Sequence, residues 1–230
     1  MNILMAASEC VPFVKVGGLA DVVGALPRYL KKLGHDVRII LPKYRIIDGN
    51  KYGLQTLPYM LRVKVGADTE NFRLKYCVTK DGITVYFIEN MRFFYRLGVY
   101  GSDGADYGDT RERYIFFCRA VLEALKAVMF RPDIIHCHDW QTGLIPAYLK
   151  TNLSNDGFFW NTSSVFSIHN IAYQGYYGAD TIDAAGFSWK DFTPDKLEFY
   201  NHVNFMKCAI AMSDAVSTVS PTYALEIKEF

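Results

Sequence analysis

The beginning of the chain combines a strand, a glycine-bearing turn and a helix, and this combination restricts the fold more than any other stretch. Residues 3–7 form a short apolar run that is typical of a buried β-strand. The turn follows as Lys15-Val16-Gly17-Gly18-Leu19-Ala20-Asp21. Pro27 predicts either a kink or a helix that begins beyond the glycines. Apolar residues with a period near 3.6 predict a helix to about residue 33: Leu19, Val22, Val23, Leu26, Leu30 and Leu33.

The turn has the properties of an anion site. Gly17 and Gly18 lack a Cβ, so the backbone can come close to a ligand. The helix N-terminus supplies partial positive charge, and Lys15 adds a full charge beside it. We interpret the stretch as a site for a sugar nucleotide, and the alternative is a plain turn whose glycines only permit tight packing. It matches neither the dinucleotide fingerprint nor the P-loop, so those two functions lose their main support.

The rest of the chain alternates between apolar strand-like runs and helical patterns. This alternation predicts a doubly wound, mostly parallel, Rossmann-like α/β sheet in one domain over residues 1–230. Three β-like runs at 60–65, 72–78 and 83–88 leave no room for helices between them, and Asp81-Gly82 favours a hairpin turn. We therefore expect an antiparallel or mixed β-hairpin insert at the edge of the sheet. The remaining strands are expected at 37–41, 134–138, 165–168 and 215–219, and helices at 110–129, 142–151, 204–212, near Pro194 and after Ser220.

Polar residues follow several of the predicted parallel strands. Glu9 and Lys15 follow the first strand, Asp139 follows 134–138, and His169 follows 165–168. The carboxyl ends of parallel strands meet at one edge of the sheet, so Lys15, Asp139 and His169 are expected to project into one crevice. Each residue also has a purely structural interpretation: Glu9 as a turn carboxylate, Asp139 as a helix N-cap and His169 as a buried, hydrogen-bonded ring.

His136 and His138 lie two apart on a predicted strand and therefore face the same side. With Asp139 they suggest a metal site, but no further ligands have an obvious source, so we expect no metal.

Composition excludes several classes of function. The net charge is +1, and the basic residues are spread along the chain, which gives no footprint for nucleic acid or for an anionic membrane. Five cysteines without CxxC spacing indicate buried thiols in a reducing compartment, so we expect a cytoplasmic protein. The 16 Tyr and 16 Phe are compatible with a carbohydrate ligand, because aromatic rings stack on sugars as well as building cores.

Several motifs, taken in order, carry a family resemblance that covers nearly the whole chain. Together they resemble the N-terminal part of bacterial glycogen synthases and plant starch synthases, which use ADP-glucose. The motifs are AASEC at 6–10, KVGGLADV at 15–22, GALP at 24–27, DYGD at 106–109 with Arg113, Phe116, Phe117 and Arg119, HDW at 138–140, FSIHNIAYQG at 166–175 and VSPTYA at 219–224.

The resemblance implies an enzyme of two Rossmann-like domains with the active site between them. Such enzymes transfer glucose from ADP-glucose to the non-reducing end of an α-1,4-glucan, such as glycogen or maltooligosaccharide, with retention and without a metal or other cofactor. The resemblance places Asp139 and His169 at the reacting glucose as the catalytic pair. It assigns the substrate-binding positions to Lys15, Gly17, Gly18 and Asp21 on the donor side, to Tyr95 on the acceptor side, and to Glu9 and Asn170.

The chain departs from the family pattern in sequence and in length. Val16 stands where Thr is frequent, Leu97 where Pro is common and Asn201 where Gly is usual. The C-terminal nucleotide-binding domain is missing, so we expect residues 1–230 to be the acceptor-side half of a longer enzyme and inactive alone. Two alternatives remain open: a stand-alone carbohydrate-binding module, and a synthase that uses another donor such as UDP-glucose.

Overall fold

The computed structural model describes residues 1–102 and 104–229. Asp103, within the expected loop 90–109, and the chain end at Phe230 lie outside the described residues. The main sheet contains β1 (Asn2–Ala6), β2 (Asp36–Pro42), β3 (Gln55–Val65), β4 (Asp68–Val78), β5 (Thr84–Glu89), β8 (Ile134–His138), β9 (Ser163–Ile168) and β13 (Ala215–Thr218). Two small sheets contain β6 (Gly101–Ser102) with β7 (Ala105–Asp106), and β10 (Tyr176–Gly178), β11 (Glu198–Phe199) and β12 (His202–Asn204). The helices are α1 (Leu19–Lys32), α2 (Met91–Phe94), α3 (Thr110–Ala127), α4 (Leu144–Lys150), α5 (Thr181–Ala185), α6 (Phe205–Met212) and α7 (Pro221–Glu226), with 3₁₀ turns η1 (Trp140–Thr142) and η2 (Trp189–Asp191).

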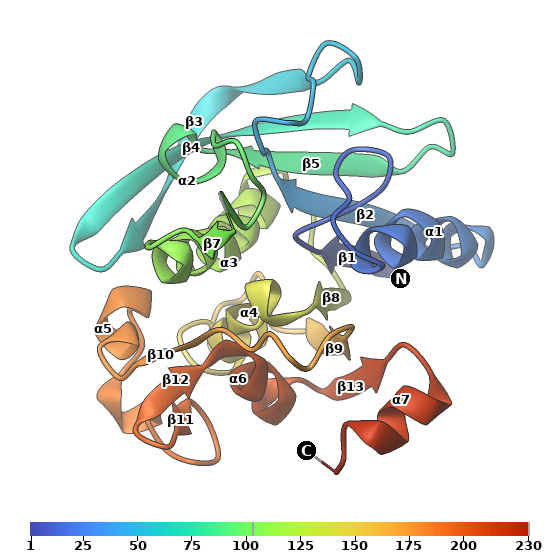
Figure 1. Ribbon diagram of the computed structural model, residues 1–230. Coiled ribbons are helices and arrows are strands. Elements are labelled where there is room, and N and C mark those ends of the chain that lie inside the picture. Colours follow the sequence, from blue (N-terminus) through green and yellow to red (C-terminus); the bar gives the residue numbers. More distant parts are fainter. Residues whose placement is uncertain (103, 230) are drawn as a thin grey trace.

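The sheet has the order β13-β9-β8-β1-β2-β5-β4-β3, from the bottom to the top of Figure 1. The strands from β13 to β5 pair in parallel, whereas β4 and β3 add to β5 as antiparallel strands. This confirms the predicted doubly wound sheet with its hairpin insert at the edge. The chain order of the parallel strands reverses between β1 and β8, and such a switch point opens a crevice beyond the carboxyl ends of the strands.

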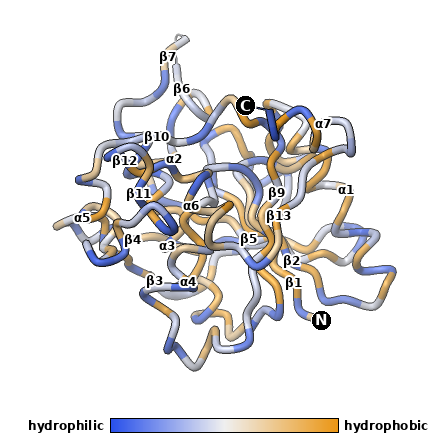
Figure 2. Tube along the Cα trace, turned by 90° about the horizontal axis from the view of Figure 1, so that it is seen from below, coloured by the Kyte–Doolittle hydropathy of each residue, from blue (hydrophilic) through white to orange (hydrophobic). Residues whose placement is uncertain are grey.

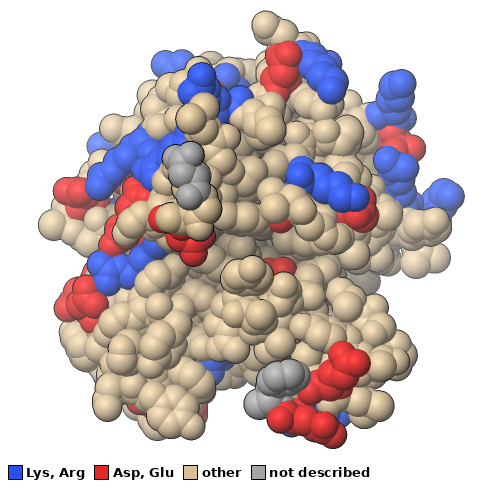
Figure 3. All heavy atoms as spheres, in the orientation of Figure 1, with Lys and Arg blue, Asp and Glu red and all other residues tan. Residues whose placement is uncertain are grey.

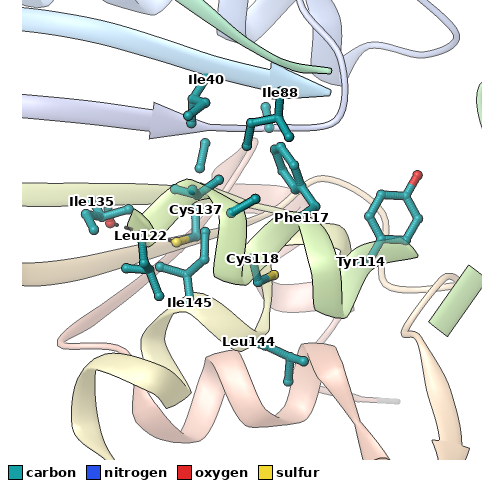
Figure 4. Close-up of a cluster of buried hydrophobic side chains, with 14 of the residues drawn as sticks. Ile40, Ile88, Tyr114, Phe117, Cys118, Leu122, Ile135, Cys137, Leu144 and Ile145 are labelled. Carbon is teal, nitrogen blue, oxygen red and sulfur yellow. Dashed lines mark hydrogen bonds between the residues drawn. The ribbon is translucent and has the colours of Figure 1, made fainter. Parts of the chain in front are cut away.

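Helices cover both faces of the sheet. Alternate strand residues, Ile40, Ile88, Ile135 and Cys137, point toward α3 and α4 and form one part of the core (Figure 4). On the opposite face the Phe13 ring lies 5.0 Å from Phe87, so the loop before α1 packs there. Figures 1 and 2 accordingly place α1 and α3 on opposite sides of the sheet, with apolar central strands between them.

Most predicted elements are confirmed, and the differences are local. Helix α1 begins directly after the glycines and continues through Pro27, so the later start is wrong. The predicted helix near Pro194 is wrong because residues 194–197 form a turn that leads into the β11–β12 hairpin, and the short helix α5 was not predicted. Loop 90–109 includes α2, β6 and β7.

Asn201 occupies the tip of the β11–β12 hairpin with φ of 61°. That region of backbone space favours glycine and tolerates asparagine better than most residues. The observed φ therefore suits glycine, the residue expected here from the resemblance, and it also accommodates Asn201.

The five cysteines are free and buried, as expected. Across the described residues, no helix is both long and apolar enough to cross a membrane. On the face shown in Figure 3, Lys and Arg lie mostly over the upper half and are interspersed with acidic residues.

Candidate functional site

A pocket of about 640 Å³ opens beyond the carboxyl ends of the parallel strands. Segments that follow β1, β8, β9 and β13 all contribute to its wall, so it lies at the switch point of the sheet. In the space-filling view, the surface is hollowed between the upper and the lower half of the molecule, where this pocket lies (Figure 3). The lining residues are Glu9, Val16, Gly17, Gly18, Leu19, Val22, Tyr100, Asp106, Thr110, Asp139, Trp140, Gln141, His169, Asn170, Tyr173 and Val219.

The glycine turn forms one wall of the pocket. A Cβ added at Gly17 or at Gly18 would meet nothing within 4 Å, so tight packing does not explain either glycine. The alternative of a turn whose glycines only permit close packing is therefore wrong. Both residues face open space at the start of α1, where a ligand can approach the backbone closely.

Glu9 holds this turn in place. Its carboxylate is buried and accepts hydrogen bonds from the backbone N–H groups of Val16 and Gly17, the latter at 2.9 Å. The Tyr100 hydroxyl donates to the other carboxylate oxygen at 2.5 Å. The structural interpretation of Glu9 as a turn carboxylate is thus confirmed, although the residue also lines the pocket.

Lys15, Asp21 and Tyr95 lie outside the lining of the pocket. The Lys15 Nζ forms an ion pair with the Asp21 carboxylate at 2.7 Å, and both side chains are about half exposed, at 53% and 54%. The expectation that Lys15 projects into the same crevice as Asp139 and His169 is therefore wrong for this conformation. The Lys15 amine instead pairs with Asp21 on the first turn of α1. The Tyr95 ring is exposed and lies 5.4 Å from the Arg45 guanidinium.

Asp139 connects two strand ends. Its Oδ1 accepts hydrogen bonds from the backbone N–H groups of His169 at 2.7 Å and Asn170 at 3.3 Å. It makes no side-chain bond to the following turn, so the N-cap alternative is wrong. Burial raises the pKa of Asp139 to about 6, and the two backbone donors only partly oppose this. Its backbone has φ of 57°, which is uncommon for a residue other than glycine.

Three histidines gather at the pocket wall, where His169 lines the pocket and His136 and His138 lie behind it. His136 and His138 face the same side of β8, as predicted, with their rings stacked at a centroid distance of 4.1 Å. The His138 Nδ1 lies 2.9 Å from the His169 Nε2. Burial lowers the pKa of His136 and of His169 to about 4 and lowers that of His138 well below its usual value. All three rings are therefore neutral at pH 7. The interpretation of His169 as a buried, hydrogen-bonded ring is confirmed for the hydrogen bond, but the residue is only partly buried.

A metal ion has no evident place in this arrangement. Within residues 1–102 and 104–229, no cluster of three or more His, Cys, Asp and Glu side chains could hold one. The His136 Nε2 instead lies 2.6 Å from the Ser167 Oγ, which lies 2.6 Å from the Ser217 Oγ. The His136 Nε2 is thus engaged by the neighbouring strand β9.

Sequence reasoning missed several lining residues. Tyr100 reaches the pocket because it bonds Glu9 across more than ninety positions of sequence, which no local pattern reveals. Gln141 lines the pocket and has a buried Oε1 without a hydrogen-bond partner among the described residues. Trp140 and Tyr173 lie inside recognised motifs, so the motifs were a signal that could have found these two.

Comparisons with known proteins agree on one family. The family model of the starch synthase catalytic domain matches residues 2–230. The glycogen synthase of Geotalea daltonii is 47% identical over 227 residues, which are 99% of this chain and 47% of that protein. Glycogen synthase 2 of Geobacter sulfurreducens is 45% identical over the same shares of the two chains.

A solved structure shows the same fold. The catalytic domain of starch synthase IV from Arabidopsis thaliana, bound to ADP and acarbose, superposes with a TM-score of 0.88 at 34% identity. The match covers 99% of this chain and 46% of that chain, and the chain likewise spans about half the length of the curated relatives it matches. The family match over nearly every residue, together with this fold, shows that the chain belongs to the starch synthase catalytic domain family.

Proposed function

We propose that residues 1–230 form the N-terminal, acceptor-side half of a retaining glycosyltransferase. The enzyme transfers glucose from ADP-glucose to the non-reducing end of an α-1,4-glucan, in glycogen or starch synthesis. The observation that carries this proposal is the pocket at the switch point, where an open glycine turn faces Asp139 and His169. A C-terminal nucleotide-binding domain completes the site, which agrees with relatives about twice as long as this chain.

In this proposal the glycine turn receives the diphosphate of the donor. The amides at the start of α1 and the helix N-terminus favour negative charge, which the leaving ADP develops. Lys15 breaks its ion pair with Asp21 and binds the phosphates of the donor instead. That exchange is inexpensive, because an exposed ion pair of this kind contributes only about 0–1 kcal/mol.

Asp139 and His169 act at the glucosyl group. Cleavage of the donor bond produces an oxocarbenium-like centre, which electron-rich groups stabilise. The Asp139 carboxylate holds the backbone of His169 and Asn170, so it fixes the peptide that carries the His169 carbonyl. Either the carboxylate or that carbonyl supplies the electron density, while Tyr95 on the exposed loop contacts the glucan acceptor.

Calorimetric titration of this chain tests the proposal. We expect measurable binding of maltooligosaccharide that Tyr95→Ala abolishes and Lys15→Ala preserves, together with weak binding of ADP-glucose that Lys15→Ala reduces further. Tight ADP-glucose binding by this chain would contradict the shared donor site. Glucan binding with no detectable binding of ADP-glucose would favour a stand-alone carbohydrate-binding module instead. Equal affinity for UDP-glucose would leave the choice of base to the other half.

A further inference from the structure

His138 lies directly behind His169 and is buried completely. It ends β8, and the two rings meet because β8 and β9 pair in parallel at the carboxyl edge of the sheet (Figure 1). The His138 Nδ1 and the His169 Nε2 are 2.9 Å apart, which is a hydrogen bond between two ring nitrogens. The other nitrogen of His138, Nε2, is buried and has no hydrogen-bond partner among the described residues.

The direction of this hydrogen bond follows from the His138 Nε2, which has no partner among the described residues. Both rings are neutral at pH 7, so each carries a single N–H. If His169 donated, the only N–H of His138 would sit at Nε2, buried and without an acceptor. If His138 donates, Nε2 keeps an unprotonated lone pair. Buried N–H groups without an acceptor are rarer in proteins than under-used acceptors, so the second arrangement is favoured.

We propose that His138 donates its Nδ1–H to the His169 Nε2 and thereby holds His169 in the Nδ1–H tautomer. His138 is then a positioning residue, which acts on the pocket only through His169. Its own neighbours support a fixed orientation, because the His136 ring stacks on it at 4.1 Å and Ser167 in turn bonds His136.

The tautomer decides what His169 offers to a ligand. His169 lines the pocket, and its Nδ1 has no hydrogen-bond partner among the residues that the structure describes. In the proposed tautomer this nitrogen donates a hydrogen bond and cannot accept one or act as a base. The matching ligand group is an acceptor oxygen, and identifying it as a hydroxyl oxygen of the glucosyl group rests on the proposed function.

Long-range ¹H–¹⁵N correlation of the imidazole nitrogens, recorded on this chain at pH 7, tests the tautomer directly. We expect His138 and His169 both to carry their proton on Nδ1, with the His169 Nε2 shifted as an acceptor. A His169 that carries its proton on Nε2 would overturn the proposal. The measurement needs no substrate and no second domain, so its failure is distinct from a failure of the proposed function.

Two variants separate positioning from mere packing. In His138→Asn the side-chain amide nitrogen takes the place of Nδ1 and can still donate, so His169 is expected to remain in the Nδ1–H tautomer. His138→Leu removes the donor, so His169 is expected to become a mixture of tautomers. The full-length protein with this substitution is expected to lose about tenfold in affinity for ADP-glucose. A purely structural role would lower the stability of both variants and leave the His169 tautomer unchanged. Should His138→Leu fail to fold, the wild-type spectrum still tests whether His169 carries its proton on Nδ1.

Discussion

Asp139 combines a backbone conformation and a buried charge that both oppose stability. Its φ of 57° lies in a region that residues other than glycine seldom adopt, and burial raises the pKa of its carboxyl group to about 6. The same geometry lets Oδ1 hold the backbone N–H groups of His169 and Asn170. A residue that has both a strained backbone and a buried carboxyl group is a strong candidate for function. This agrees with the proposed place of Asp139 at the reacting glucose.

Asp139→Asn should reveal the cost of this charge. Well below pH 4 the carboxyl is protonated in both the folded and unfolded states, so its ionisation costs nothing. Well above pH 6 it is ionised in both, and the raised folded pKa then costs about 2–3 kcal/mol. Wild type should therefore lose stability relative to Asp139→Asn as pH rises from 4 to 6, measured by urea unfolding at several pH values. A difference in stability between the two proteins that does not change with pH would contradict this account. The full-length Asp139→Asn variant should also lose its transfer activity.

Glu9→Ala should loosen the glycine turn. The substitution leaves the Val16 and Gly17 amides without their acceptor, whereas the Tyr100 hydroxyl keeps the Ser8 Oγ as a partner at 2.9 Å. Unpaired donors of this kind should lower the free energy of unfolding by about 2 kcal/mol. Tyr100→Phe is the matched control, because it removes one donor and leaves the turn amides bonded, so its loss should be smaller. Urea denaturation compares the two, and equal stability of Glu9→Ala and wild type would contradict the role of Glu9.

At the scale of elements, the glycine in α1 and the glycines in the turn before it are of two kinds. A Cβ on Gly24 would lie 2.3 Å from the Val11 Cγ2 and 2.9 Å from the Val11 carbonyl oxygen, whereas a Cβ on Gly17, just before the helix, would meet nothing. Gly24→Ala should therefore cost about 2–3 kcal/mol, because α1 must shift from the preceding loop. Gly17→Ala should stay within about 0.5 kcal/mol of wild type in thermal unfolding, yet weaken ADP-glucose binding in the full-length protein. Similar stability losses in both variants would contradict this division.

The elements that the sequence predicts well are those set by local periodicity. The strands of the parallel sheet and helices α1, α3 and α6 follow apolar periods, and the shared edge of the parallel strands brings Gly17, Asp139 and His169 to one pocket. Helix α5 depends instead on distant partners, since the Arg119 guanidinium and the Tyr148 hydroxyl both donate to the Ala185 carbonyl. No pattern within such a short helix reveals these contacts.

Side-chain direction is the part of the site that sequence could not predict. The strand–turn–helix pattern places the backbone at Lys15, but whether its amine points into the pocket or to Asp21 depends on competing charges. The bond between His138 and His169 similarly requires the register of β8 against β9, in which His138 lies opposite Ser167. These features belong to tertiary geometry and follow only once the sheet is assembled.

At the scale of the whole molecule, one Rossmann-like sheet supplies one wall of the proposed active site. Ligand sites usually enclose most of the ligand surface, whereas this pocket lies at the open edge of a sheet. The chain also spans about half the length of its curated relatives. These facts together make catalysis by residues 1–230 alone physically unfavourable, because the groups that neutralise the leaving diphosphate must surround it.

A single-turnover assay of ADP release tests this division of the enzyme. With maltooligosaccharide and excess protein, residues 1–230 should release no ADP above the uncatalysed background, whereas the full-length protein should release it in a glucan-dependent manner. The reason is that charge on the departing ADP is stabilised only by groups preorganised around it, and the glycine turn faces it from one side. Full-length Asp139→Asn, folded but inactive, serves as the control for contaminating hydrolysis. Glucan-dependent release by residues 1–230 alone would show that the donor site is complete within this sheet, and the proposed second wall would then have to be abandoned.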